Sequence, residues 1–480
     1  MKPVATAQQI RDAEQEWFAA HPGGDLMGRA ADAVARVCAG VLAGRAHRGV
    51  LVVAGPGNNA GDALFAAAEL PGLLGARVPI WVWPVAGATH DDGLAAALAS
   101  GATVVDAAGA LLLADGVGVL VDGISGLGGR PGIGDAVSAV ARAATGAGVP
   151  VVAVDIPSGL VADEVAAHRS VRASHTVTFI AHKLAHVAQP AASACGQVSL
   201  VDIGVTVPAS AVHQVEDADC AAWFPFPAPA SDKYSRGVVG LDTGSADYPG
   251  AAVLGAAGAL WAGAGMVRYA GPRRPAAAVL DAHPSVVVPV DPGDPGRVQA
   301  WVCGSGWPDA DADRLALRLS DGVPVVVDAG ALDGLAALGA GALPAGSVLT
   351  PHAGELARLL GVTRSEVEAR PIEHARRAAA GHGATVLLKG ATQYAAAEDG
   401  RVVIAQPGTP WTATAGSGDV LAGVLGALLA AGLAAPEASV VAASLQAQAA
   451  LAHDHPIPPE RLAERFGAVI ERWSRIVERT

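Results

Sequence analysis

One aspartate stands alone among small and apolar residues in the segment TATAGSGDVLAGVLGALLAAG, residues 412–432. Gly416, Ser417 and Gly418 precede it, and the apolar run that follows has the composition of a buried helix. Free backbone N–H groups and the positive end of such a helix can hold a phosphate. Asp419, in the first turn, could then take a proton from a hydroxyl group that attacks phosphorus. The alternative is that Asp419 only caps the helix.

A second glycine-rich turn lies in VVAGPGNNAGDAL, residues 52–64. Its glycine spacing differs from the dinucleotide fingerprint G-x-G-x-x-G, because the third glycine falls at position 61 rather than 60. The side chains of Asn58 and Asn59 offer carbonyl oxygens, which suit a hard cation or the hydroxyl groups of a nucleotide. A plain turn capped by Asp62 is the alternative.

Two further strand ends carry oxygen donors. Asp122 ends a strand in VLVDGISGLGGRPG, and Asp155 and Ser158 end another in VVAVDIPSGL. Ligands of open α/β sheets bind outside the carboxyl ends of the strands, so these groups are expected to converge. His182 and His186 have a chelating spacing, but a strand-like segment precedes them and no third ligand is evident, so they do not predict a metal site.

The elements that must position these residues alternate between short β-branched runs and alanine-rich segments, which predicts α/β domains with parallel, doubly wound sheets. A first series of strands ends near Gly204, and a proline run at 225–229 is typical of a stiff linker. We therefore predict two domains, 1–220 and 221–480. The predicted strands are GVLVVAG, VPIWVW, GVLVDGI, VPVVAVDIP, HTVTFI and VSLVDIG in the first domain, and GVVGLDTGS, SVVVPV, AWVCGSG, VPVVVDAG, SVLTPH and TVLLKG in the second.

The composition restricts the class of protein. A net charge of −13 argues against nucleic acid as a partner, and four scattered cysteines without a C-x-x-C pair predict free thiols. The N-terminus resembles no signal peptide, and no apolar run reaches the roughly 20 residues that a membrane span needs. We expect a cytoplasmic, homo-oligomeric protein that binds small molecules and no membrane.

The set GPGNNAGD, VDGISG, DIPSG and FIAHK resembles the NAD(P)HX epimerase domain of bacterial NAD(P)H-hydrate repair enzymes, over residues 5–210. The resemblance implies a Rossmann-like fold and a catalytic role for Lys183. It implies a potassium ion held by Asn59, Asp122 and Ser158. The residues implied to bind the hydrated nucleotide are Asn58, Asn59, Ala60, Gly61, Asp62, Gly126, Leu127, Gly128, Gly129, Arg130, Pro131, Gly132 and Asp155. The chain departs from the family at Ala60, commonly glycine, and at Ser125, commonly phenylalanine.

Residues 230–478 resemble the ribokinase-like ADP-dependent (S)-NAD(P)H-hydrate dehydratases through KYSRG, YPGAA, GAGMVR, TPHAGE, LLKGA and AGSGDVLAG, in the family's order. The resemblance makes Asp419 the catalytic base and a substrate contact. It implies hydrate contacts at Ala251, Gly306 and His352. The implied nucleotide-binding residues are Lys389, Gly390, Ala391, Thr392, Gln393 and Gly418. Gly330 stands where the family commonly has aspartate.

The implied chemistry is repair of hydrated NADH and NADPH. In the dehydratase reaction Asp419 deprotonates the C6 hydroxyl group, which attacks the terminal phosphoryl group of ADP, bound with Mg²⁺. Phosphate then leaves and the ring double bond returns. Because the dehydratase takes only the S epimer, a fused epimerase that interconverts R and S completes the repair.

Two alternatives remain from the residues themselves. The C-terminal half could be a ribokinase-like kinase that phosphorylates a small alcohol and uses the same Asp419. The N-terminal half could be a binding module without catalysis, as Ala60 and Ser125 suggest. The motifs leave open ADP against ATP, and NADHX against NADPHX.

Overall fold

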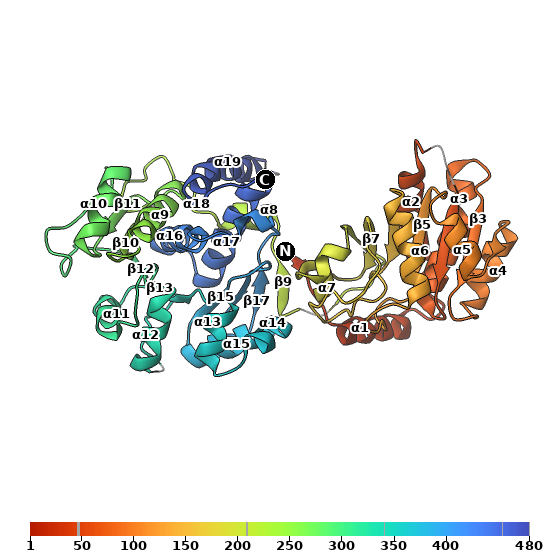
Figure 1. The fold of residues 1–480 in the computed structure, drawn as a ribbon, viewed down its shortest axis with the longest axis horizontal. Helices are drawn as coiled ribbons and strands as arrows, with labels where there is room; N and C mark the ends of the chain where they lie inside the picture. The colour runs from red at the N-terminus through yellow and green to blue at the C-terminus, as the bar shows by residue number, and fades with distance from the viewer. Residues whose placement is uncertain (46–48, 208–209, 340, 454, 480) are drawn as a thin grey trace. The chain divides into compact units, whose positions relative to one another are not determined.

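The computed structural model describes residues 1–45, 49–207, 210–339, 341–453 and 455–479 (Figure 1). The chain folds as two compact units that meet in sequence between Ser210 and Ala211. The N-terminal unit is Pro3–Ser210, and the C-terminal unit is Ala211–Thr480 together with Met1 and Lys2. The proline run at 225–229 therefore lies inside the C-terminal unit. Among the described residues, no helix is both long enough and apolar enough to cross a membrane.

The N-terminal unit is built on a seven-stranded sheet in the order β4-β3-β2-β5-β6-β7-β8, with every neighbouring pair parallel. Its central strands are buried valine-rich runs, as expected where helices cover both faces. In spatial order the strands are β4 (Thr103–Val104), β3 (Ile80–Pro84), β2 (Val50–Ala54), β5 (Val119–Gly123), β6 (Val151–Val154), β7 (His175–Phe179) and β8 (Gln197–Val201).

Helices cover both faces of this sheet, which confirms the predicted doubly wound arrangement. One face packs on α2 (Leu26–Leu42), α3 (Asn58–Leu74) and α4 (Asp91–Ala99), and the other on α5 (Ala107–Leu113) and α6 (Asp135–Gly146). The remaining helices of the unit are α1 (Ala7–Ala20), α7 (Leu184–Val187) and the 3₁₀ turn η1 (Ala191–Ala194).

The C-terminal unit has a ten-stranded mixed sheet in the order β1-β9-β17-β16-β15-β14-β13-β12-β10-β11. β16 runs antiparallel to both of its neighbours, whereas β10 to β15 pair in parallel. The strands are β1 (Lys2–Pro3), β9 (Val212–Gln214), β10 (Val238–Asp242), β11 (Met266–Tyr269), β12 (Ala300–Cys303), β13 (Val325–Val327), β14 (Val348–Leu349), β15 (Thr385–Leu388), β16 (Tyr394–Ala396) and β17 (Val402–Ile404).

This sheet is also covered on both sides. The main apolar core joins it to α9 (Pro249–Trp261), α16 (Ser417–Ala430), α17 (Ala435–Leu451) and α19 (Phe466–Val477). On the opposite side lie α11 (Ala312–Leu319), α12 (Gly330–Leu338), α13 (Ala353–Leu360) and α15 (Pro371–His382) (Figure 1). The remaining elements are α8 (Asp217–Trp223), α10 (Arg273–Ala282), α14 (Arg364–Ala369), α18 (Pro459–Leu462), η2 (Pro410–Thr412) and η3 (Ala463–Arg465).

Most predicted strands are present, but SVVVPV at 285–290 is not a strand. Only Val287 forms an isolated bridge, with Arg268, and Val290 is fully exposed. Pro289 cannot donate a ladder hydrogen bond, which explains why valine content alone misled the prediction. The hairpin of β16 and β17 was not predicted, because its strands are short.

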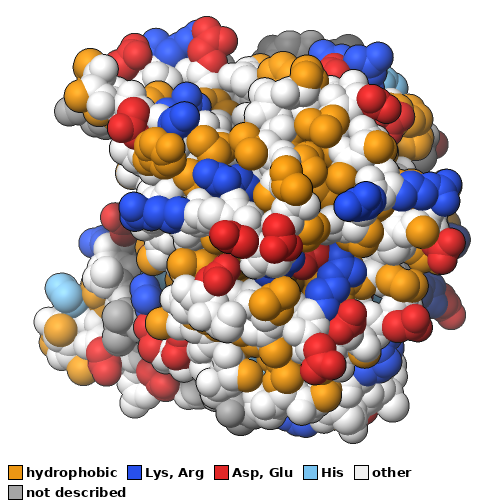
Figure 2. Space-filling model, turned by 90° about the vertical axis from the view of Figure 1, so that its left-hand side faces the viewer, with side chains coloured by type: hydrophobic (Ala, Val, Ile, Leu, Met, Phe, Trp, Pro, Cys, Tyr) orange, Lys and Arg blue, Asp and Glu red, His pale blue; other side chains and the backbone are white. Residues whose placement is uncertain are grey.

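Figure 2 shows the end of the C-terminal unit that carries α10, where acidic and basic side chains lie interspersed.

Helices α9 and α16 approach each other so closely that only glycine fits at their contact. A Cβ atom on Gly423 would lie 2.0 Å from the carbonyl oxygen of Gly255, and one on Gly258 would lie 2.2 Å from that of Val420. Such distances are far below van der Waals contact. The alanine- and glycine-rich composition of these helices therefore holds the first turns of α16 in place against α9.

We expect Gly423→Ala to lower the free energy of unfolding of the C-terminal unit by about 1–3 kcal/mol, because the added methyl group must displace α9. Urea unfolding followed by tryptophan fluorescence measures this. Gly467→Ala in α19 is the control, since no atom lies within 4 Å of its added Cβ and alanine favours a helix. Equal stabilities of the two variants would contradict the packing argument.

Candidate active sites

The first site begins where β2 runs into α3. The backbone of Gly55 passes so close to Ile124 that a Cβ atom would lie 1.9 Å from the Ile124 carbonyl oxygen. The segment from Asn58 is not a turn, as its glycines suggested, but the first turn of α3, with Gly57 as its N-cap. Since this N-cap offers no side-chain acceptor, and no partner is present among the described residues for the N–H groups of Asn58 and Asn59, these two groups are available to an anion.

The departure at Ala60 has little effect on this turn. Ala60 lies within α3, so it needs no positive φ, and its methyl group is fully buried in the core. Asn59 and Asp62 are three residues apart and therefore lie on the same side of α3. Burial, together with the negative charges of Asp155, Glu14 and Asp25, raises the pKa of Asp62 to about 8. Asp62 therefore retains its proton at neutral pH.

The loop that follows β5 brings a second segment to this site. A Cβ atom on Gly126 would lie 2.7 Å from Asn59 Oδ1 and 2.8 Å from Asp155 Oδ2, so all three residues meet here. The N–H of Gly129 donates to the carbonyl of Gly126 at 2.8 Å, and Gly132 has a φ of +85°. Leu127 packs into the core, whereas Gly128, Arg130 and Pro131 are exposed.

A buried ion pair between Lys183 and Asp155 also belongs to this site. Lys183 is 1% exposed, and its Nζ donates to Asp155 Oδ1 at 2.5 Å and to Thr178 Oγ1 at 2.7 Å. Thr178 Oγ1 also donates to Asp155 Oδ1 at 3.0 Å. Asp155 follows β6 with a φ of +64°, a conformation that aspartate adopts more readily than most residues. Sequence reasoning proposed Asp155 and Lys183 separately and did not predict that they pair.

Asp122 and Ser158 also come together. Ser158 Oγ donates to Asp122 Oδ1 at 2.6 Å, and the Ser158 N–H donates to Oδ2 at 2.8 Å. The N–H of Ser125 donates to Ser158 Oγ at 3.2 Å, so Ser125 contributes through its backbone. Asp122 is fully buried, and burial raises its pKa to about 6.

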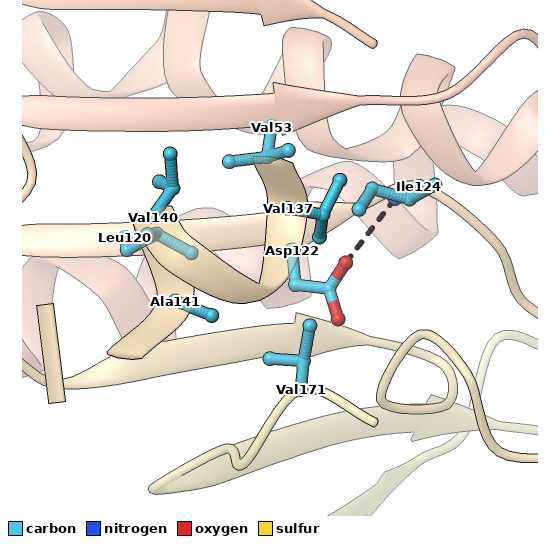
Figure 3. A pocket seen from close by; sticks show the side chains of 8 residues that line it. All are labelled: Val53, Leu120, Asp122, Ile124, Val137, Val140, Ala141 and Val171. Atoms are coloured by element: carbon cyan, nitrogen blue, oxygen red, sulfur yellow. Dashed lines mark hydrogen bonds between the residues drawn. The ribbon is translucent and has the colours of Figure 1, made fainter. Parts of the chain in front are cut away.

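The buried carboxylate of Asp122 is the feature of this region that fits a monovalent cation. The cavity of about 10 Å³ beside Asp122 is otherwise lined by apolar residues, including Val53 and Val171, so its lining adds no further side-chain oxygen (Figure 3). Within the described part of the chain no lysine, arginine or histidine pairs with this carboxylate, and the oxygen Oδ1 of Asn59 lies near Gly126 in the same site. Since a buried charge needs a counter-charge, oxygen donors of this kind suit a hard cation such as potassium.

Glu14 on α1 belongs to the same environment and was missed by the sequence analysis. It is half-buried, and burial and Asp155 raise its pKa, opposed by Lys183 and Arg11. Arg11, one turn earlier, donates to the carbonyl of Leu127 at 3.1 Å and so ties α1 to the glycine loop. The segment AQQIRDAEQEW carries no motif from which this position could have been inferred.

The second site lies at the start of α16. Ser417 and Gly418 belong to its first turn rather than preceding it, and Gly416 is the N-cap, with a φ of +96°. Among the described residues no hydrogen-bond partner is present for the N–H groups of Gly418 and Asp419, which leaves them available to a phosphate. Gln446 of α17 holds this turn, because its Nε2 donates to the carbonyl of Ser417 at 2.7 Å.

A lysine paired with a buried aspartate faces this helix start. Lys389 Nζ donates to Asp328 Oδ1 at 2.6 Å, and Asp328 also accepts from Ser305 Oγ at 2.7 Å and Thr350 Oγ1 at 2.8 Å. A Cβ atom on Gly418 would lie 3.6 Å from Lys389 Nζ. Sequence reasoning named Lys389 as a nucleotide contact but did not predict its pairing with Asp328.

The electrostatics of this site separate its two aspartates. Burial opposes ionisation of Asp328, but Lys389 and the hydroxyl donors hold its pKa below the ordinary value. Burial and the negative charge of Asp328 raise the pKa of Asp419 to about 7, opposed by Lys389. Asp419 can therefore exchange a proton near neutral pH, which a general base requires.

The residues predicted to contact the hydrate lie near Asp419 and Lys389. A Cβ atom on Gly306 would lie 2.6 Å from the Cβ of Ala251, so these two residues touch. Ala251 precedes Gly255 by one turn of α9, and Gly255 lies against the backbone of Asp419. The backbones of His352 and Lys389 form an isolated parallel β-bridge. The Nδ1 of His352 accepts hydrogen bonds from the N–H groups of Gly354 and Glu355.

The remaining predicted nucleotide contacts follow directly from Lys389. Gly390 and Ala391 are exposed, and Thr392 and Gln393 are half-buried. The Oε1 of Gln393 is buried and has no hydrogen-bond partner among the described residues. Gly330, where the family commonly has aspartate, begins α12 and packs against Trp307, since a Cβ atom there would lie 2.8 Å from the Trp307 Cβ. A side chain at position 330 would collide with this tryptophan.

Comparison with known proteins assigns each unit to a family. Residues 239–464 match the NAD(P)H-hydrate dehydratase family, and residues 23–185 match the family described as YjeF-related protein N-terminus. The crystal structure of the ADP/ATP-dependent NAD(P)H-hydrate dehydratase from Bacillus subtilis, co-crystallised with ATP/Mg²⁺, covers 54% of this chain. That match includes 97% of the crystallised chain, at 26% identity and a TM-score of 0.50. The ribokinase-like fold predicted for the C-terminal unit is thereby confirmed.

Full-length relatives contain both units in the same chain. The bifunctional NAD(P)H-hydrate repair enzyme Nnr of Mycobacterium leprae (strain TN) is 41% identical over 462 residues, covering 94% of each chain. The enzyme of that name from Escherichia coli (strain K12) is 31% identical, covering 92% of this chain and 86% of its own. The chain belongs to the family of bifunctional NAD(P)H-hydrate repair enzymes.

Proposed function

We propose that this chain repairs hydrated NADH and NADPH, with the N-terminal unit interconverting the R and S epimers and the C-terminal unit dehydrating the S epimer. The observation that carries the proposal is the placement of Asp419 in a helix turn with free N–H groups, opposite Lys389. A carboxylate with a pKa of about 7 beside a phosphate-binding helix start suits phosphorylation of a hydroxyl group.

In the dehydratase half, Asp419 takes the proton of the C6 hydroxyl group, whose oxygen then attacks the terminal phosphoryl group of ADP. The bond from that phosphorus to the bridging oxygen breaks, and AMP leaves. Phosphate leaves from C6, helped by the ring nitrogen, and a proton leaves C5 as the double bond forms. The nucleotide is held by Lys389, the N–H of Gly418 and residues 390–393. The hydrate is contacted by Ala251, Gly306 and His352. Mg²⁺ bound with the nucleotide would neutralise part of its phosphate charge.

In the epimerase half, residues 58–62 and 126–132 bind the nucleotide, and the start of α3 offers N–H groups to a phosphate. The Asp155–Lys183 pair gives and takes protons at the C6 hydroxyl group, which must leave and return on the other face of the ring. Potassium held by Asn59, Asp122 and Ser158 would supply positive charge beside the buried carboxylate.

Three further points complete the proposal. ADP is the expected phosphoryl donor, and assays with ADP and with ATP compare the two. The enzyme works in the cytoplasm, where its nucleotide substrates are found and its free thiols stay reduced. It assembles as a homo-oligomer, which light scattering on the purified chain tests.

The decisive experiment follows reduced-nicotinamide absorbance from a mixed pool of R- and S-NADHX, with ADP, Mg²⁺ and K⁺ supplied. Complete recovery supports both activities. Recovery that stops at the S fraction supports the dehydratase and makes the N-terminal unit a binding module. No recovery, with a stable phosphorylated product from another alcohol, favours the kinase alternative.

Asp419→Asn is expected to lower the dehydratase kcat by about 10²–10⁴-fold, because the base is lost while the shape is kept. For the unsubstituted chain kcat/KM should rise with pH through about 7, since Asp419 must be ionised to accept a proton. Steady-state rates across pH measure both effects. Asp399→Asn, at an exposed position, is the control and should leave the rates unchanged. A flat pH profile in the unsubstituted chain would exclude Asp419 as the base.

Asp122→Asn is expected to raise the K⁺ concentration that half-saturates the epimerase by about 10–100-fold, because the cation loses its charged ligand. The epimerase rate is titrated with K⁺ against an inert organic cation, and the K⁺-dependent rise in Tm is measured in parallel. The dehydratase rate of the same variant is the internal control. An unchanged K⁺ dependence in both measurements would contradict this site.

A further inference from the structure

His186, in the short helix α7, makes two hydrogen bonds inside the N-terminal unit. Its side chain is 5% exposed. The backbone N–H of Lys183 donates to Nδ1 at 3.1 Å, and Nε2 lies 2.9 Å from the backbone carbonyl oxygen of Asp155. Because Nδ1 accepts a hydrogen bond, it carries no proton, and Nε2 must be the donor to the carbonyl.

The backbone of Asp155 needs such a support. Its φ of +64° is uncommon for any residue with a side chain, and it turns the chain sharply after β6. The Asp155 N–H is held by the carbonyl of Val177 at 2.7 Å. For the Asp155 carbonyl, His186 is the hydrogen-bond partner found among the described residues. Strained positions persist where the surroundings determine them completely, and His186 supplies part of that determination.

Lys183 is held by the same imidazole. Its backbone N–H reaches Nδ1 of His186, while its Nζ reaches the carboxylate of Asp155. The three residues therefore form a closed ring of hydrogen bonds: Asp155 carboxylate to Lys183 ammonium, Lys183 backbone to His186, and His186 to the Asp155 backbone. One neutral ring thus sets the separation of two backbones whose side chains form the buried ion pair.

We propose that His186 is a positioning residue of the epimerase, which holds the Asp155–Lys183 pair in its working geometry by clamping both backbones. The inference rests on the proposed function, because it needs Asp155 and Lys183 to act on the substrate. His186 itself touches no substrate atom in this scheme. Its contribution is to keep the ion pair where the C6 hydroxyl group is bound.

The surroundings of the ring keep it neutral. Burial, the ammonium of Lys183 and the neighbouring His182 hold the pKa of His186 well below its ordinary value, opposed by the bond to the Asp155 carbonyl. The rings of His182 and His186 are 6.0 Å apart, edge to face. A neutral ring retains its acceptor at Nδ1, so the clamp persists across the physiological pH range. Both ring nitrogens are used, which leaves His186 no lone pair for a metal ion.

His186→Ala is expected to lower the epimerase kcat by about 10–100-fold, since small displacements of reacting groups are costly, with KM changed much less. His186→Asn can keep an acceptor near the Lys183 N–H, and His186→Gln can reach towards the Asp155 carbonyl. Each of these variants should restore part of the lost kcat. The dehydratase rate of every variant, measured on pure S-NADHX, should stay unchanged.

Two further variants make the outcome decisive. His175→Ala, at the opposite end of β7, is the matched control and should keep full epimerase activity. Asp155→Asn tests the site itself: if it leaves the epimerase intact, the proposed function of this pair fails. If Asp155→Asn is inactive but His186→Ala keeps the kcat of the unsubstituted chain, the positioning role is overturned. Should His186→Ala not fold, His186→Leu takes its place, because it fills the same space without a ring nitrogen, and an unchanged kcat in that variant overturns the positioning role equally.

Discussion

A buried aspartate paired with a lysine anchors each of the two sites. In the N-terminal unit Asp155 follows β6 and meets Lys183, and in the C-terminal unit Asp328 follows β13 and meets Lys389, at 2.5 and 2.6 Å. Neither charge could be buried alone at acceptable cost, and hydroxyl groups complete the coordination of both carboxylates. Each pair connects two strand ends, and so fixes the edge of the sheet at which ligands of α/β proteins bind.

The pairs also determine which carboxyl groups can exchange protons. The lysine already pairs with the first aspartate. The pKa of a second aspartate nearby is therefore raised by burial and by the like charge more than the lysine lowers it. This raises the pKa of Asp62 to about 8 and that of Asp419 to about 7. A carboxylate paired with a lysine, beside a second carboxylate that titrates near neutral pH, recurs in both units, although their folds and reactions differ. Asymmetry of this kind is what acid–base chemistry needs.

Backbone placement matters as much as charge. The start of α16 is set by its glycine contacts with α9 and by Gln446, so the N–H groups that can hold a phosphate are fixed before any ligand arrives. In the N-terminal unit the corresponding constraint is the turn at Asp155, supported by His186. Preorganised donors of this type stabilise developing charge without rearrangement during the reaction.

The sequence alone determined the α/β class of each unit, the strands that end in Asp122 and Asp155, and the helix that carries Asp419 in its first turn, but not the antiparallel strand β16. These follow from local rules, since buried parallel strands are apolar runs and glycine-rich turns precede phosphate-binding helices. It could not exclude SVVVPV as a strand, because short valine runs are ambiguous without their neighbours.

Only the tertiary structure decided how distant residues combine. Three contacts join segments that no motif connects. They are the pairing of Asp328 with Lys389, the approach of Glu14 to Asp155, and the hydrogen bonds of His186 to Asp155 and Lys183. The proline run at 225–229 resembled a linker, yet Phe224 beside it packs on Trp473 at 5.8 Å, so this segment belongs to the C-terminal unit. Side-chain contacts between remote segments depend on how whole elements pack, and spacing along the chain does not encode that packing.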